Sequence, residues 1–142
     1  MKVRELMSNP VVRIHPDEPV TVAARTLAHY NIGAMPVCGT DGRVCGVITD
    51  RDIVTRCLAA QRSPDQTKVR EVMTRQVLAV SPDSELDTAA RLMGSRQVRR
   101  LPVVENGRLC GMLSLGDVAN CASGTDAAAD ALTEITGNIS RR

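Results

Sequence analysis

Two short motifs in the chain combine a hydroxyl residue with an aspartate three positions later. Thr49 is followed by Asp52, and Ser114 is followed by Asp117. At a helix start this spacing is typical of a capping box, in which the hydroxyl and the acid each accept a backbone N–H. It also suits a ligand, because free N–H groups and the helix dipole attract a phosphate, while the aspartate accepts from both ribose hydroxyls. The residues alone leave both interpretations open.

Four neighbours of these motifs are also candidate binding residues or aids to binding. Asp50 and Arg51 lie between Thr49 and Asp52, and Arg51 places a cation near the predicted helix start. Gly46 and Gly111 each precede a motif by three residues. A glycine in a strand permits close approach of another group, so we expect a ligand to approach the strand at these positions.

Arg99 and Arg100 stand just before the apolar stretch Leu101–Val103. Guanidinium groups bind phosphate in bidentate fashion, which makes this pair a candidate phosphate site. The alternative is a solvated basic pair at the start of a strand. In the first half of the chain the matching residues are Gly33 and Ala34. The two halves therefore cannot provide chemically equivalent sites.

An internal repeat organises these candidates. Val3–Met7 (VRELM) matches Val69–Met73 (VREVM), and the matches continue through Pro-Asp, Ala-Ala-Arg, Pro-Val, Gly-Arg and Cys-Gly pairs in the same order. A duplicated unit usually buries its open face against its copy, which predicts a pseudo-two-fold arrangement. We divide the chain into a first repeat, a linker, a second repeat and a C-terminal tail, at 1–60, 61–67, 68–121 and 122–142.

Each repeat predicts the order strand, helix, strand, strand, helix. Apolar positions with helical spacing follow Pro-Asp in both copies, and β-branched or apolar runs flank a short turn. The predicted strands are 11–14, 34–38 and 44–48, then 77–80, 101–104 and 109–113. The predicted closing helices are 50–60 and 115–121. The tail has no counterpart in the repeat, and a short helix or partial disorder is expected there.

Short-range signals predict how these elements begin and turn. Asp17 and Asp83 stand where an aspartate caps the first helix of each repeat. Asp41-Gly42 and Asn106-Gly107 join the two later strands, and such dipeptides favour a type I′ hairpin turn.

Composition excludes several classes of protein. The 142 residues include 18 Lys and Arg against 16 Asp and Glu, a net charge of +2, and the only aromatic residue is one Tyr. A near-neutral chain without aromatic platforms is not expected to bind nucleic acid. No apolar run approaches the roughly 20 residues that span a bilayer, and the N-terminus lacks the apolar stretch of a signal peptide. We therefore expect a cytoplasmic protein that binds neither nucleic acid nor membrane.

The five cysteines and two histidines support no catalytic or metal motif. There is no Cys-x-x-Cys, and no nucleophile and base stand out, so we expect no catalytic residues and no metal ligands. Free cysteines are typical of a reducing compartment and of apolar cores. The alternative is a thiol or metal sensor that uses residues such as Cys45 and Cys110, which share one repeat position.

The ordered set of features resembles a tandem pair of cystathionine-β-synthase (CBS) domains, also called a Bateman module. The set consists of an apolar-Pro-Val strand, a hairpin, the Gly-x-x-Thr/Ser-x-x-Asp stretch and the duplication of all three over residues 1–121. The resemblance implies an α/β fold of two pseudo-symmetric β-α-β-β-α repeats packed through their sheets. It also implies a non-catalytic sensor that binds an adenosine-containing ligand in the cleft between the repeats.

The resemblance further implies roles for individual residues. Asp52 and Asp117 would contact ribose, and Thr49 and Ser114 would lie near the phosphates with Arg99 and Arg100. Val12 and Leu78, on the strands 11–14 and 77–80, would wall the adenine, although both are equally consistent with plain core.

The expected ligand is AMP, ADP, ATP or S-adenosylmethionine, with no obligatory cofactor. A homodimer formed through helical faces and an unidentified partner protein are also expected. The alternatives are the thiol or metal sensor and a purely structural dimerisation module.

Overall fold

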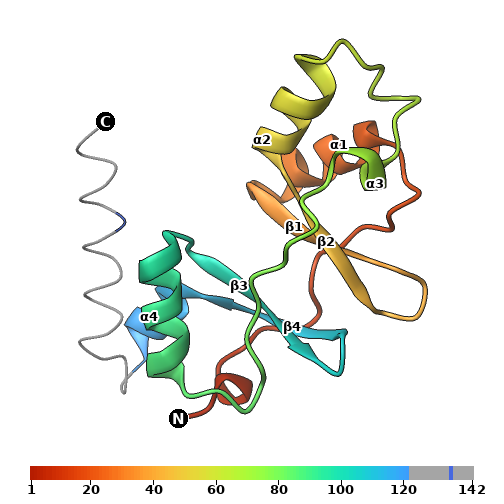
Figure 1. Ribbon diagram of the computed structural model, residues 1–142. Coiled ribbons are helices and arrows are strands. Elements are labelled where there is room, and N and C mark those ends of the chain that lie inside the picture. Colours follow the sequence, from red (N-terminus) through yellow and green to blue (C-terminus); the bar gives the residue numbers. More distant parts are fainter. Residues whose placement is uncertain (122–134, 136–142) are drawn as a thin grey trace. The chain divides into compact units, whose positions relative to one another are not determined.

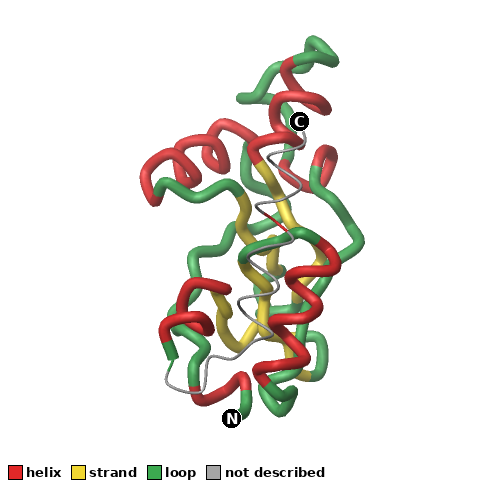
Figure 2. The backbone as a smooth tube through the Cα atoms, turned by 90° about the vertical axis from the view of Figure 1, so that its left-hand side faces the viewer, coloured by secondary structure: helices red, strands yellow, loops and turns green. Residues whose placement is uncertain are grey.

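The computed structural model describes residues 1–121 and residue 135, so the predicted tail helix lies outside the described residues except for Ile135. It confirms an α/β fold with two two-stranded antiparallel sheets, each accompanied by helices (Figures 1 and 2). None of the described helices is long and apolar enough to cross a membrane.

The chain packs into two compact units that differ from the two sequence repeats. Unit 1 gathers Met1–Val11, Leu78–Asn106 and Cys110–Arg142, and unit 2 gathers Val12–Val77 and Gly107–Leu109. The opening segment of each repeat therefore packs with the body of the other repeat. The stretch 61–67, predicted as a linker, belongs to unit 2, where the carbonyl of Thr67 accepts a hydrogen bond from the backbone N–H of Val20 at 2.9 Å.

Unit 2 is built around the helix α1 (Val20–Tyr30) and the hairpin of β1 (Ala34–Cys38) and β2 (Val44–Thr49). The chain continues into α2 (Asp50–Asp52), the π-helical turn η2 (Ile53–Leu58) and later α3 (Val69–Val72). Its core is aliphatic, because α1, β1 and β2 turn Val20, Val37 and Ile48 fully inward.

Unit 1 repeats this plan. It contains the single turn η1 (Val3–Glu5), α4 (Leu86–Arg96), β3 (Arg100–Glu105), β4 (Arg108–Ser114) and α5 (Leu115–Asn120). The buried side chains of α4 and of the two strands form a second aliphatic cluster, which Ile135 joins with 7% of its surface exposed.

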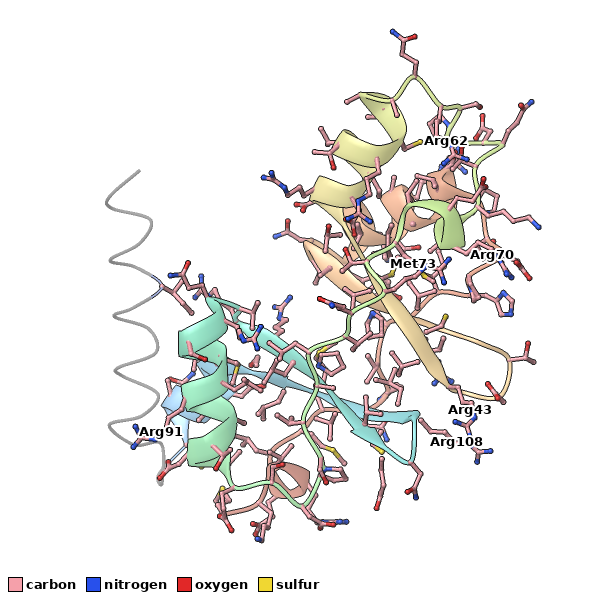
Figure 3. All side chains as sticks on the ribbon, viewed as in Figure 1. Arg43, Arg62, Arg70, Met73, Arg91 and Arg108 are labelled. Carbon is pink, nitrogen blue, oxygen red and sulfur yellow. The ribbon has the colours of Figure 1, made fainter. Side chains whose placement is uncertain are left out.

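In each unit, the exchanged segment pairs with the second strand of the hairpin. In unit 2, Thr74 and Val47 exchange two backbone hydrogen bonds of 2.9 Å, and in unit 1 Ser8 and Met112 do the same at 2.8 and 3.0 Å. Figure 3 labels Met73 on this segment, beside β2. The exchanged segment thus adds one bridge to each two-stranded sheet.

Packing of the exchanged segment explains why a glycine stands at the same place in both repeats, at Gly46 and Gly111. A Cβ on Gly46 would lie 2.8 Å from both the Met73 sulfur and the Thr74 carbonyl oxygen, and a Cβ on Gly111 would lie 2.9 Å from the Met7 sulfur. The expected approach of a ligand at these glycines is therefore wrong, because the space is filled by the exchanged segment.

The predicted helix caps at Asp17 and Asp83 are also wrong. The N-cap residues of α1 and α4 are Pro19 and Glu85, and neither makes a side-chain capping bond. Asp17 instead accepts a hydrogen bond from Arg70, and Asp83 accepts one from Arg4. Both aspartates therefore hold an exchanged segment rather than a helix start.

Of the two predicted type I′ hairpin turns, the second is confirmed and the first is not. Asn106 and Gly107 both have positive φ, 54° and 80°, as a type I′ turn requires. In the first hairpin only Gly42 has positive φ, and the turn is widened because the Gly39 N–H donates to the Arg43 carbonyl.

The predicted strands 11–14 and 77–80 are reduced to one bridge each. Ile14 pairs in parallel with Val37, and Val80 pairs in parallel with Val103.

Candidate functional site

Thr49 and Asp52 form the capping box that their spacing indicates. The Thr49 hydroxyl accepts the backbone N–H of Asp52 at 2.9 Å, and the Asp52 carboxylate accepts the backbone N–H of Thr49 at 3.1 Å. The pair fixes the start of α2 directly after β2. Asp52 is only 6% exposed, so its charge is held inside unit 2.

Two further residues hold the buried Asp52 carboxylate, and sequence reasoning missed both. The Thr74 hydroxyl lies 3.1 Å from each Asp52 carboxylate oxygen, and Arg56 Nε lies 3.7 Å from Oδ1. A buried carboxylate requires such partners, because an unpaired one is costly to desolvate. The available signal for Thr74 was the hydroxyl that follows a methionine in both repeats, at Ser8 and Thr74.

Asp50 and Arg51, the two residues between Thr49 and Asp52, are exposed. The Asp50 carboxylate accepts the backbone N–H of Arg51 at 2.7 Å, and the Asp50 N–H donates to the Gly33 carbonyl at 2.9 Å. A Cβ on Gly33 would lie 3.5 Å from the Asp50 carboxylate. Gly33 is the counterpart of Arg99 in the first repeat. In unit 2 the Asp50 carboxylate therefore lies beside the position that an arginine occupies in the second repeat.

Ser114 and Asp117 make only half of the corresponding motif. The Ser114 hydroxyl accepts the backbone N–H of Asp117 at 3.1 Å and caps α5. Asp117 is exposed, and within the described part of the chain its carboxylate makes no hydrogen bond or ion pair. The Ser8 hydroxyl, which corresponds to Thr74, donates to the Met112 carbonyl at 3.2 Å instead.

Arg99 and Arg100 lie beside this open aspartate motif in the same unit. The Leu115 N–H, at the start of α5, donates to the Arg99 carbonyl at 2.8 Å, so the start of β3 adjoins the start of α5. Both arginines are exposed. The backbone of Arg99 in unit 1 therefore lies at the start of α5, next to the Ser114–Asp117 motif.

Val12 and Leu78 are half-buried and pack against the edges of the two cores. Val12 joins the cluster of unit 2, and Leu78 joins that of unit 1. Each unit thus has one of these aliphatic side chains at its margin.

Cys38, Cys45 and Cys57 are free thiols, and the pKa values of the first two are shifted. Burial raises the pKa of the Cys38 thiol, and burial also raises the pKa of the Cys45 thiol. Reactive cysteines have lowered pKa values, since the thiolate is the nucleophile. Over residues 1–121 and 135, no group of three or more His, Cys, Asp or Glu could hold a metal ion.

Comparison with known proteins gives a consistent result. The family model for the CBS domain matches residues 3–59 and 69–124. The chain is 37% identical to the CBS domain-containing protein YhcV of Bacillus subtilis over 134 residues, which is 94% of each chain. It is 34% identical to Hypoxic response protein 1 of Mycobacterium tuberculosis over 116 residues, covering 82% of this chain and 81% of that protein.

Two solved structures share the fold. A crystal structure of Hypoxic Response Protein I with two coordinated zinc ions has a TM-score of 0.75 and 34% identity, covering 84% of this chain and 97% of that one. The CBS domain pair of protein MJ0100, in complex with 5-methylthioadenosine and S-adenosyl-L-methionine, has a TM-score of 0.70 and 28% identity, covering 84% and 93%. With two matched domains and these relatives, the chain belongs to the CBS domain family and is a tandem CBS pair.

Proposed function

We propose that the protein is a non-catalytic sensor that binds an adenosine-containing nucleotide at the Asp117 motif of unit 1. The observation that carries the proposal is the juxtaposition of Arg99 with the start of α5, next to an exposed and unengaged Asp117. The Asp117 carboxylate has its acceptor oxygens available for two ribose hydroxyls. The Ser114 hydroxyl and the two arginines supply donors for a phosphate.

The charge of this site favours an anionic ligand. Arg99 and Arg100 repel a sulfonium and attract phosphate, so AMP, ADP or ATP should bind more tightly than S-adenosylmethionine. The complex of the MJ0100 pair supports an adenosine-containing ligand in general. For nucleotide to act as a signal, it must bind two states of the protein with different affinity, and a partner protein then responds to the change.

A thermal-shift panel tests the proposal. It compares AMP, ADP, ATP, S-adenosylmethionine, GTP and zinc on the unmodified protein, Asp117→Ala and the control Asp41→Ala. A ligand at about 100 times its Kd adds about 2.7 kcal/mol, or about 5–10 °C for a chain of this size. We expect an adenine-nucleotide shift that Asp117→Ala abolishes and Asp41→Ala keeps.

Other outcomes of the panel contradict the proposal. An adenine-nucleotide shift that persists in Asp117→Ala would place the ligand elsewhere. A shift with zinc and none with nucleotide would favour the metal sensor, for which the zinc-containing relative is the precedent.

We also propose that two copies associate through the η2 face of unit 2. Val54 and Leu58 lie one turn apart on this face and are 56% and 53% exposed. Exposed apolar pairs on a helix favour association with an identical face across a two-fold axis. Light scattering should give a dimer that Leu58→Glu converts to a monomer, while Thr55→Glu on the adjacent polar position does so less. A monomeric unmodified protein would contradict this association.

A further inference from the structure

We propose that Thr74 is a built-in occupant of the Asp52 motif and closes it to nucleotide until its hydroxyl turns away. The inference rests on the proposed function, because it concerns the second copy of the same binding motif. Asp52 stands in the Thr-x-x-Asp motif that corresponds to the proposed ribose site at Asp117. Yet the Thr74 hydroxyl lies 3.1 Å from both carboxylate oxygens of Asp52. A secondary hydroxyl is the same donor that a ribose offers, so Thr74 takes the place of the ligand.

Two other groups also contact the Asp52 carboxylate. Its Oδ2 accepts the Thr49 N–H at 3.1 Å, and Arg56 Nε lies 3.7 Å from Oδ1. Asp52 is 6% exposed, which leaves little surface for a ligand to reach. Two ribose hydroxyls can bind this carboxylate only if the Thr74 hydroxyl leaves.

The backbone of Thr74 is fixed, so the side chain alone has to move. Two backbone hydrogen bonds of 2.9 Å join Thr74 to Val47, and Met73 packs over Gly46. Threonine is stiff at χ1 because it is β-branched. Release is therefore a change of one side-chain rotamer. The apparent Kd of this site is then the Kd of the open state divided by the fraction of molecules that are open.

Unit 1 provides the internal control. Ser8 occupies the position of Thr74 and makes the equivalent backbone pairing with Met112. The Ser8 hydroxyl donates to the Met112 carbonyl at 3.2 Å and not to the Asp117 carboxylate. The same backbone geometry therefore accompanies an occupied aspartate in one unit and an open one in the other.

Isothermal titration calorimetry with AMP, ADP and ATP tests the inference through the number of nucleotides bound per chain. We expect one site in the unmodified protein, two in Thr74→Ala and one in the matched control Ser8→Ala. The double variant Thr74→Ala with Asp117→Ala should keep one site, now at Asp52.

Thr74→Ser is a second variant for the case that Thr74→Ala does not fold, since serine keeps a hydroxyl as a hydrogen-bond donor to Asp52. Its unbranched side chain turns more freely, so we expect a second site weaker than that of Thr74→Ala. Circular dichroism melts establish that each variant is folded before titration.

The results separate this inference from the proposed function. One site in the unmodified protein and one in both Thr74 variants would overturn the role of Thr74 while leaving the Asp117 site intact. Two sites in the unmodified protein would also overturn it. No binding to the unmodified protein but one site in Thr74→Ala would refute the Asp117 site and support Thr74, and no binding to any variant would refute both.

Discussion

Asp52 and Asp117 occupy the same place in the two repeats but not the same environment. Asp52 is buried and has Thr49, Thr74 and Arg56 as partners. Asp117 is exposed, with arginines at the neighbouring strand start. A duplicated motif can therefore stabilise the fold in one copy and leave its carboxylate exposed in the other. Substitutions at equivalent positions of the two units should therefore have unequal effects.

The largest effect is expected from removing the buried carboxylate. Asp52→Ala eliminates the capping box and leaves the Thr74 hydroxyl without its acceptor, which should cost about 2–3 kcal/mol of unfolding free energy. Asp117→Ala should change it by no more than about 0.5 kcal/mol, as for an ordinary surface site. Urea unfolding monitored by circular dichroism measures both. Equal losses would erase the contrast.

The next prediction concerns a feature in which the units agree. Gly46→Ala and Gly111→Ala should each cost about 1–3 kcal/mol, because the new Cβ meets an exchanged methionine and a backbone carbonyl. Gly116→Ala, where nothing lies within 4 Å of the Cβ position, should instead stabilise α5 by up to about 1 kcal/mol.

Thermal unfolding provides the measurement for this glycine series. A harmless Gly46→Ala beside a damaging Gly111→Ala would mean that the exchange is tight in unit 1 alone.

The smallest effect is a pH dependence of the surface ion pairs. The hydrogen bond from Arg70 lowers the pKa of Asp17 in unit 2, and the hydrogen bond from Lys2 lowers the pKa of Glu85 in unit 1. A lowered folded pKa gives stability that is present above the ordinary values of 3.8 and 4.5 and is lost as pH falls through the folded pKa.

The test compares unfolding midpoints at pH 7 and at pH 3. Arg70→Met and Lys2→Met should each lose less stability on acidification than the unmodified protein, by a similar small amount that salt reduces further. An unchanged acid response in one variant would assign the ion-pair contribution to the other unit.

Much of the fold could be predicted from the sequence because its signals are local. Helical spacing predicted α1 and α4, and the Asn106-Gly107 dipeptide between two apolar runs predicted the second hairpin with its turn type. The Thr49–Asp52 capping box also follows from spacing alone. The caps at Asp17 and Asp83 failed because a distant arginine competed for each carboxylate.

The duplication, the α/β class and the residues that could carry chemistry all follow from local patterns in the amino-acid sequence. The tertiary structure decided how the opening segments are exchanged, and therefore that Thr74 meets Asp52 while Ser8 turns to a carbonyl. The physical reason is sequence separation. Spacing fixes the partners within one turn of helix, whereas the partners of a buried carboxylate come from whichever distant segment packs over it.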